Sequence, residues 1–167
     1  MLTKLSPQAT KRTGKVAAVI VAAALALTGC SGGDDTTGET TETTLTRSVE
    51  GAELTVTYVA DGDKVTKQTT KNVVNYEASG IADRAAAEES VAPLAEQYKG
   101  IKGVEHSIDF GDDELTETVT LTYADLDLEK LASVTGGDPG ENPEEARDVS
   151  LKEAVKTLTD SGFTEVK

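Results

Sequence analysis

The chain contains segments in which apolar and polar residues alternate, which is the pattern of a β-strand with one buried face. In the first of them, Leu54, Val56 and Tyr58 alternate with Thr55 and Thr57. Short turns join the segments in pairs, and an Asp-Gly step between two such runs is a strong signal for a hairpin. The four predicted strands are residues 53–59, 64–74, 103–110 and 114–123. The sequence therefore predicts two β-hairpins.

Apolar residues at helical spacing predict helices over about 81–98, 125–136 and 150–162. Pro93 is expected to kink the first helix, because proline removes a helical hydrogen bond. The last helix has the clearest ends, since Ser150 and Glu153 form a capping box and Gly162 suits a left-handed C-terminal position.

Together these elements predict an α+β fold. We expect an antiparallel four-stranded sheet built from two β-hairpins, in the order ββα-ββα-α, with the helices packed on one face. The apolar faces of the strands would contact the helices. The opposite face, which is rich in threonine, would be left open to water.

The N-terminal segment has the three parts of an export signal. Four basic residues precede an apolar run at 16–27, which is shorter than the roughly 20 residues that a membrane-spanning helix needs. The run ends at Leu27-Thr28-Gly29-Cys30, a lipobox that predicts cleavage before Cys30 and lipid attachment to its thiol. The alternative is an uncleaved anchor with an incidental cysteine. Lipidation is favoured because Cys30 is the only cysteine and stands at the required position.

Three regions follow from these patterns. Residues 1–29 are predicted to be a lipoprotein signal peptide. Residues 30–46 are predicted to be the lipidated cysteine and a flexible linker, because threonine, glycine and acidic residues cannot form a core. Residues 47–167 have the length of a single domain.

Charge excludes one class of partner. The chain has 16 basic and 30 acidic residues; four basic ones precede Cys30 and every acidic one follows it, so residues 30–167 carry a formal charge of −18. Nucleic-acid binding is not expected, because it requires a basic surface. The expected contact with the membrane is the lipid on Cys30, at the extracytoplasmic face of the cell membrane.

Several segments resemble a known family. The runs DGDKVTKQTTKNVVNYE, YKGIKGVEHSIDF, TLTYADLDLEKL and VSLKEAVKTLTDSGFTEVK are similar to the YehR-like bacterial lipoproteins, whose domain has no known function. The resemblance covers about residues 53–167 and includes the lipobox. It implies a small α+β lipoprotein domain, and it supplies no catalytic or ligand-binding residues.

The sequence offers little catalytic chemistry. His106 is the one histidine, and its register with Val104 and Ile108 predicts a partly buried sheet residue. A catalytic role would require a cleft that joins it to acids such as Glu105 or Asp109, which alternation places on the opposite face. We therefore expect no enzymatic activity and no cofactor.

Two acidic clusters, 112–114 and 138–148, are candidate calcium sites. Neither has the spacing of acidic residues that a preformed calcium loop shows, so solvated charge is favoured and no metal is expected.

Two functions remain open. If the threonine face is a recognition surface, the protein is an extracytoplasmic binding or interaction module. If that face is only hydrated, the domain is a structural or regulatory accessory subunit of a membrane complex.

Overall fold

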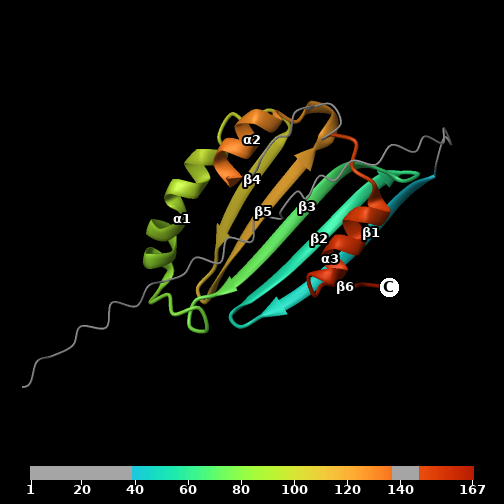
Figure 1. Ribbon diagram of the computed structural model, residues 1–167. Coiled ribbons are helices and arrows are strands. Elements are labelled where there is room, and N and C mark those ends of the chain that lie inside the picture. Colours follow the sequence, from blue (N-terminus) through green and yellow to red (C-terminus); the bar gives the residue numbers. More distant parts are fainter. Residues whose placement is uncertain (1–38, 137–146) are drawn as a thin grey trace, which may run out of the picture.

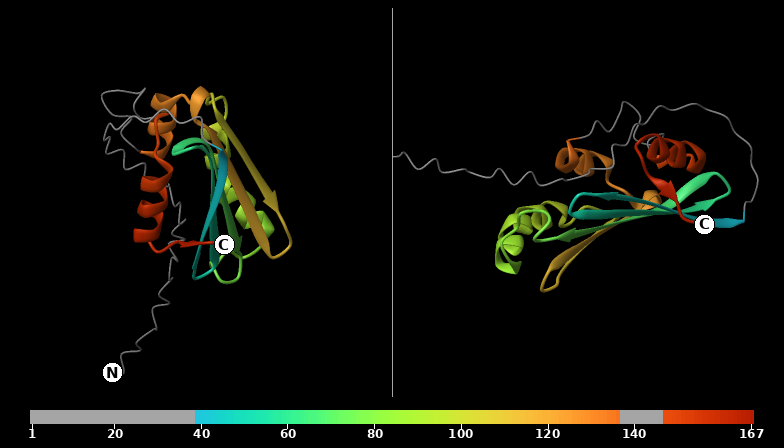
Figure 2. Two further views of the ribbon diagram at one scale, coloured as in Figure 1. Left: turned by 90° about the vertical axis from the view of Figure 1, so that its right-hand side faces the viewer. Right: turned by 90° about the horizontal axis from the view of Figure 1, so that it is seen from below.

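The computed structural model describes residues 39–136 and 147–167, which form one antiparallel sheet with helices packed against it (Figure 1). The six strands lie in the order β4-β5-β3-β2-β1-β6. The strands are β1 (Thr40–Val49), β2 (Ala52–Asp61), β3 (Lys64–Asn75), β4 (Val104–Phe110), β5 (Glu114–Thr122) and β6 (Thr164–Glu165). The helices are α1 (Arg84–Tyr98), the 3-10 turn η1 (Tyr123–Asp125), α2 (Leu128–Thr135) and α3 (Leu151–Asp160). The fold is α+β, and Figure 2 shows α1, α2 and α3 on the same side of the twisted sheet.

The predicted four-stranded sheet is wrong, because β1 and β6 extend it to six strands. Strand β1 lies mostly within residues 30–46, the segment predicted to be a linker. Its threonines are β-branched and favour extended backbone, and Leu45 is 0% exposed beneath them. The two-residue turn to β2 places Gly51 at a φ of 79°, which suits glycine.

The outer edge of β1 is covered by the C-terminal segment. Thr46 pairs with Thr164 and Leu45 with Glu165, so the two-residue strand β6 closes this edge over part of its length. The guanidinium of Arg47 lies 6.0 Å from the ring centroid of Phe163, which is itself buried. The sequence prediction missed β6 because two residues carry no readable alternation.

The two predicted hairpins, β2–β3 and β4–β5, are present and are joined through β3 and β5. The register aligns five strands, so side chains from distant segments form rows across the helix-covered face. Two of those rows are largely apolar, and between them lie polar residues. These polar residues are Thr70, Asn72, His106 and Glu117. Gln68, on the same face, lies in the row with Leu121, where its Oε1 accepts a hydrogen bond from the buried Tyr123 hydroxyl at 2.8 Å.

This polar seam separates two apolar clusters. The larger cluster contains Leu45, Val56 and Tyr58 and packs under α2 and α3. The smaller one contains Tyr76, Ala87 and Leu115 and packs under α1. The core is therefore divided in two, with α1 resting on the smaller part.

Helix α3 has the predicted ends. The Ser150 side chain accepts a hydrogen bond from the Glu153 N–H, and the Phe163 N–H donates to the Leu158 carbonyl at 3.0 Å, as the predicted caps require. Helix α1 begins later than predicted, after its N-cap Asp83, and runs without interruption through Pro93. The predicted acidic loop between α2 and α3 lies largely outside the described residues. Over the described residues, no helix has the length and apolar character needed to cross a membrane.

Candidate ligand groove between α1 and β4

A groove of about 560 Å³ lies between helix α1 and strand β4, at one edge of the sheet. Small and apolar side chains of α1 form one wall, and the inward-facing side chains of β4 form the other. The residues that line it include Glu88, Val91, Ala92, Tyr98, His106, Ile108 and Phe110. We call this feature the α1–β4 groove.

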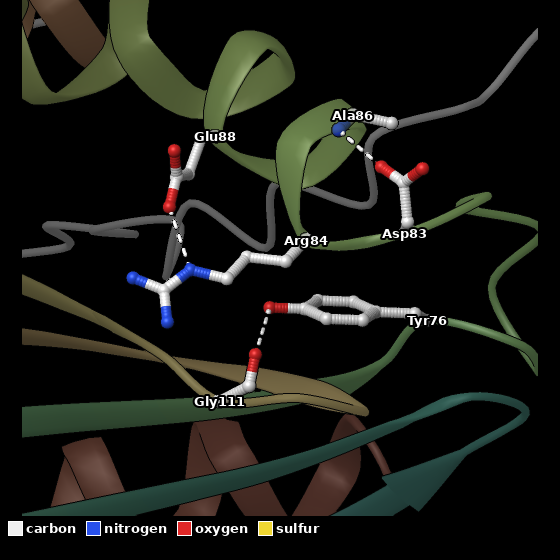
Figure 3. Close-up of polar contacts among 6 residues, drawn as sticks. All are labelled: Tyr76, Asp83, Arg84, Ala86, Glu88 and Gly111. Carbon is white, nitrogen blue, oxygen red and sulfur yellow. Dashed lines mark hydrogen bonds and ion pairs between the residues drawn. The ribbon is translucent and has the colours of Figure 1, made fainter.

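Contacts at the start of α1 fix this wall of the groove (Figure 3). The Asp83 carboxylate accepts a hydrogen bond from the Ala86 N–H at 2.9 Å and so caps the helix. The Tyr76 hydroxyl donates to the Gly111 carbonyl at 3.3 Å, which connects the segment before α1 to the β4–β5 turn. Arg84 pairs with Glu88 at 2.8 Å. The helix is therefore held at its first turn, while its exposed face borders the groove.

The floor of the groove is polar. The His106 Nε2 lies 2.9 Å from the Glu117 Oε1, and their side chains are 6% and 18% exposed. The Tyr98 ring is stacked at a tilt on the His106 ring, with 4.7 Å between centroids. His106 lines the groove, and the Glu117 carboxylate on the neighbouring strand holds it from behind. Partial burial strengthens this interaction.

The surroundings of Tyr98 in the groove shift the pKa of its hydroxyl. Burial, and in second place the charge of Glu117, raises the pKa of the Tyr98 hydroxyl above its usual value. The hydroxyl therefore stays protonated at neutral pH. It presents a neutral hydrogen-bonding group beside the His106–Glu117 pair rather than a charge.

Behind Glu117 lies a polar atom without a partner. Asn72 on β3 is the cross-strand neighbour of Glu117, and its Oδ1 is buried with no hydrogen bond among the described residues. A buried acceptor without a partner is costly and is uncommon in folded proteins. The polar seam therefore has unused hydrogen-bonding capacity next to the floor of the groove.

Strand β4 forms the edge of the sheet beside this groove. The Thr122 N–H donates to the Gly103 carbonyl and the Gly111 N–H donates to the Glu114 carbonyl, each at 2.8 Å. Hydrogen-bonded pairs alternate along an antiparallel ladder, so odd-numbered residues of β4 direct their backbone groups toward β5. The even-numbered residues of β4 direct their backbone N–H and C=O groups outward, away from β5. Over residues 39–136 and 147–167, the outward groups of His106, Ile108 and Phe110 have no backbone partner.

The predicted site residues are distributed as follows. His106 faces the groove, while Glu105 and Asp109 are exposed on the opposite face, as alternation requires. The acid beside His106 is instead Glu117, on the neighbouring strand. Residues 112–114 are exposed at a turn, and within the described part of the chain no group of three potential ligand side chains is placed to hold a metal. Cys30 lies outside the described residues.

Sequence reasoning missed Glu117 because its partner is eleven residues away on another strand. The available signal was the alternation of residues 114–123, where Glu117 falls in register with Leu115, Val119 and Leu121. A charged residue at an inward-facing position predicts a partner on an adjacent strand. Combined with the short turn at 111–113, that register would have paired it with the face that carries His106.

A second hollow, of about 390 Å³, lies beside η1 and α2. Most of its charged groups already have partners among the described residues. Lys102 pairs with Asp125 at 3.1 Å, and Arg147 donates to the Leu126 carbonyl at 3.0 Å. This hollow therefore offers fewer free groups to a ligand than the α1–β4 groove does.

Comparisons with known proteins agree on one family. The family model described as "Protein of unknown function (DUF1307)" matches residues 40–164. The uncharacterized lipoprotein Lmo0207 of Listeria monocytogenes is 32% identical over 130 residues, covering 77% of this chain and 84% of that protein. The uncharacterized lipoprotein YehR of Escherichia coli is 27% identical over 160 residues, covering 94% and 99%.

Solved structures show the same fold. The NMR structure of Escherichia coli YehR has a TM-score of 0.66 at 25% identity, covering 78% of this chain and 93% of that chain. An NMR structure of a protein from Streptococcus pneumoniae has a TM-score of 0.51 at 14% identity. This likeness concerns the fold alone. The family match begins at residue 40, where β1 begins.

Proposed function

The chain belongs to the DUF1307 family of proteins of unknown function, and we propose that it is a lipid-anchored, extracytoplasmic binding module whose ligand occupies the α1–β4 groove. The resemblance to the YehR-like lipoproteins is confirmed. Relatives named as lipoproteins, together with the lipobox, support attachment to the membrane through a lipid on Cys30.

The anchor limits how far the domain extends. Strand β1 begins at Thr40, ten residues after Cys30. A chain spans at most about 3.5 Å per residue, so Thr40 lies within about 35 Å of the lipidated cysteine whatever the conformation between them. In the proposed arrangement the domain works close to the membrane surface.

The observation that carries the proposal is the groove itself. It combines largely apolar walls, a histidine on its floor that a carboxylate orients from the neighbouring strand, and a strand edge without a backbone partner among the described residues. Apolar walls with a few oriented polar groups are the common form of a ligand site. A fully packed edge would have none of these features.

We also propose that the groove binds its ligand without reacting with it. His106 has an orienting carboxylate, but Ser107, the neighbouring hydroxyl residue on β4, borders the groove with its backbone while alternation directs its side chain to the opposite face. Nucleophilic catalysis needs a hydroxyl or thiol within reach of the base. The pair is better suited to accepting and donating hydrogen bonds to a ligand.

A photo-crosslinking experiment in intact cells tests the binding role. A photoreactive amino acid in place of Ala92 would stand at the exposed side of the groove, and one in place of Lys156 on α3 provides an exposed control. We expect a specific adduct from position 92 alone, and its loss when excess unlabelled protein competes. Equal labelling from both positions, or none from position 92 at normal abundance, would contradict the proposal.

The accessory-subunit alternative rests on the threonine face. Threonine hydroxyls there pair across strands, Thr44 with Thr57 at 3.0 Å and Thr69 with Thr120 at 3.3 Å, and no helix covers this face in the described part of the chain. A photoreactive residue in place of Lys71 lies in the middle of this face. Adducts with a membrane protein from position 71, without any from position 92, would favour the accessory role.

A further inference from the structure

We propose that the α1–β4 groove binds an extended peptide segment of another protein, which adds to the sheet as a seventh strand along β4 and whose residues alternate between apolar and basic. This inference rests on the proposed binding function and names the chemistry of its ligand. It follows from three features of β4: its free backbone groups, the groove on one of its faces and the acids on the other.

The backbone of β4 is prepared for another strand. The outward N–H and C=O groups of His106, Ile108 and Phe110 have no backbone partner among residues 39–136 and 147–167. An exposed strand edge of this kind pairs readily with an added chain. The opposite edge of the sheet differs, because β6 covers part of β1.

The two faces of β4 determine the side chains that fit. On the groove face, His106, Ile108 and Phe110 lie opposite the small residues of α1, so every second residue of an added strand would enter an apolar space. On the other face Glu105 and Asp109 are exposed. Opposite charges on directly paired strands stabilise a sheet, so the alternate residues of the added strand should be basic.

The same acids argue against a second copy of this chain. In a symmetric antiparallel pairing of two β4 strands centred on Ser107, Glu105 of one chain would lie opposite Asp109 of the other. Like charges in direct cross-strand positions are destabilising. Residues 30–167 carry a formal charge of −18, so two copies also repel one another at long range. A basic partner would instead be attracted both by Glu105 and Asp109 and by the net negative charge of the chain.

Synthetic peptides provide a direct test. The full chain, held in detergent micelles, is titrated against fluorescent peptides of alternating lysine and valine, of alternating glutamate and valine, and of lysines and valines in blocks. We expect the alternating basic peptide to bind at least about tenfold more tightly than either of the others. Equal affinity for the alternating and blocked basic peptides would overturn the proposal, because it would indicate charge attraction alone.

Two changes test the backbone pairing. Ile108→Pro removes an outward N–H while leaving the β4–β5 ladder intact, and proline is tolerated on strand edges. Because this variant also removes an apolar contact, the second test leaves the protein unchanged and methylates the backbone nitrogens of the peptide at alternate positions. Ile108→Pro, and methylation in the register whose N–H groups face β4, should each weaken binding about tenfold or more, whereas methylation in the other register should have little effect. Full binding by both methylated peptides would overturn the strand-addition mechanism.

Charge reversal tests the selection for basic residues. The double variant Glu105→Lys and Asp109→Lys should reverse the preference toward the glutamate peptide. The matched control, Glu42→Lys and Glu53→Lys, makes the same change in charge on the same face at distant strands. The control should keep the preference for lysine. Identical behaviour of the two variants would show that net charge rather than β4 selects the ligand.

The results separate this inference from the broader proposal. Crosslinks from position 92 that persist in Ile108→Pro would keep the groove as a binding site and reject the added strand. Self-association of the chain in sedimentation experiments, lost in Ile108→Pro, would reject the basic partner in favour of a second copy. Tight binding of the alternating peptide that depends on both β4 backbone and β4 acids would support the inference.

Discussion

The two halves of the sheet are covered in different ways. Over β1 and β2, helix α3 is connected to the β2–β3 turn, where Asp63 accepts hydrogen bonds from the Ser150 hydroxyl at 2.8 Å and the Lys152 N–H at 3.1 Å. The adjacent edge is capped by β6. Over β4 and β5, helix α1 buries only Ala87 completely and leaves a groove beside an open edge.

We infer from this difference that the part of the sheet under α3 mainly stabilises the fold, whereas the part under α1 provides the binding surface. Helix α3 packs on the larger cluster, which also extends under α2 and contains most of the buried side chains, so we expect this part of the fold to be the more stable. The α1 half has a small cluster and a polar seam with an unpartnered Asn72 Oδ1. Binding surfaces are commonly found in regions of lower local stability that a rigid scaffold positions. If this is so, substitutions in the part under α3 should cost more stability than equivalent substitutions in the part under α1.

Truncation of a buried residue should cost far more in the α3 half. Leu45→Ala removes a fully buried side chain from β1, so we expect the free energy of unfolding to fall by about 2–5 kcal/mol. Val91→Ala, on the half-buried face of α1, should cost less than about 1.5 kcal/mol. Urea denaturation measures both, and equal losses would contradict the division.

Alkaline pH should destabilise the α3 half through Tyr58. Burial raises the pKa of Tyr58 to about 12 from 10.0, so the folded state retains a proton that the unfolded state loses. The contribution of Tyr58 to stability is therefore constant below pH 10 and is lost as the pH rises from about 10 to 12, by roughly 2–3 kcal/mol. Tyr76, Tyr98 and Tyr123, whose pKa values burial also raises, add to the total alkaline loss. Tyr58→Phe should remove this part of the pH dependence, as measured by denaturation at a series of pH values. An unchanged slope in this variant would place the titrating group elsewhere.

The helix caps provide a matched pair at intermediate size. Ser150→Ala removes the α3 cap and its bond to Asp63, and we expect a loss of about 1–2 kcal/mol. Asp83→Ala removes the α1 cap and should cost about 0.5–1 kcal/mol, because α1 is less strongly coupled to the core. Thermal denaturation ranks the two variants. A larger loss for Asp83→Ala would show that α1 contributes more to the fold than its burial indicates.

The smallest effect is expected at the floor of the groove. Glu117→Gln keeps the shape of the side chain and allows a neutral hydrogen bond to His106, so the change in stability should be within about 1 kcal/mol. His106→Gln should be similarly mild. Both variants should weaken ligand binding without abolishing it, because the walls of the groove and the β4 edge are unchanged. Complete loss of the cellular role in His106→Gln at normal stability, with crosslinking from position 92 retained, would bring an enzymatic function forward.

The sequence predicted well those elements whose signals are local. The capping box at Ser150, the Asp-Gly turn and the alternation of residues 53–59 each specify a structure within a few residues. Strand β1 was missed because it has only one strongly apolar inward residue, Leu45, among threonines that composition alone assigns to a linker. It becomes a strand because β2 offers a partner along its whole length.

The groove was not predictable from local signals. Its floor depends on the register of β4 against β5, which brings Glu117 beside His106. Its openness depends on the sheet order, which leaves β4 at the edge, and on the light packing of α1. The alternation of residues 103–110 predicted which side chains share a face, but not which edge of the strand would remain unpaired.

Residue-resolved amide hydrogen exchange measures whether the outer edge of β4 is free to pair with an added strand. The N–H groups of Glu105, Ser107 and Asp109 point toward β5, whereas those of His106, Ile108 and Phe110 point outward. In the free protein we expect the outward set to exchange on the order of 100-fold faster than the inward set, and the two sets to become similar when the alternating basic peptide is bound. Equal protection of the two sets in the free protein would show that the β4 edge is already covered and would contradict the account.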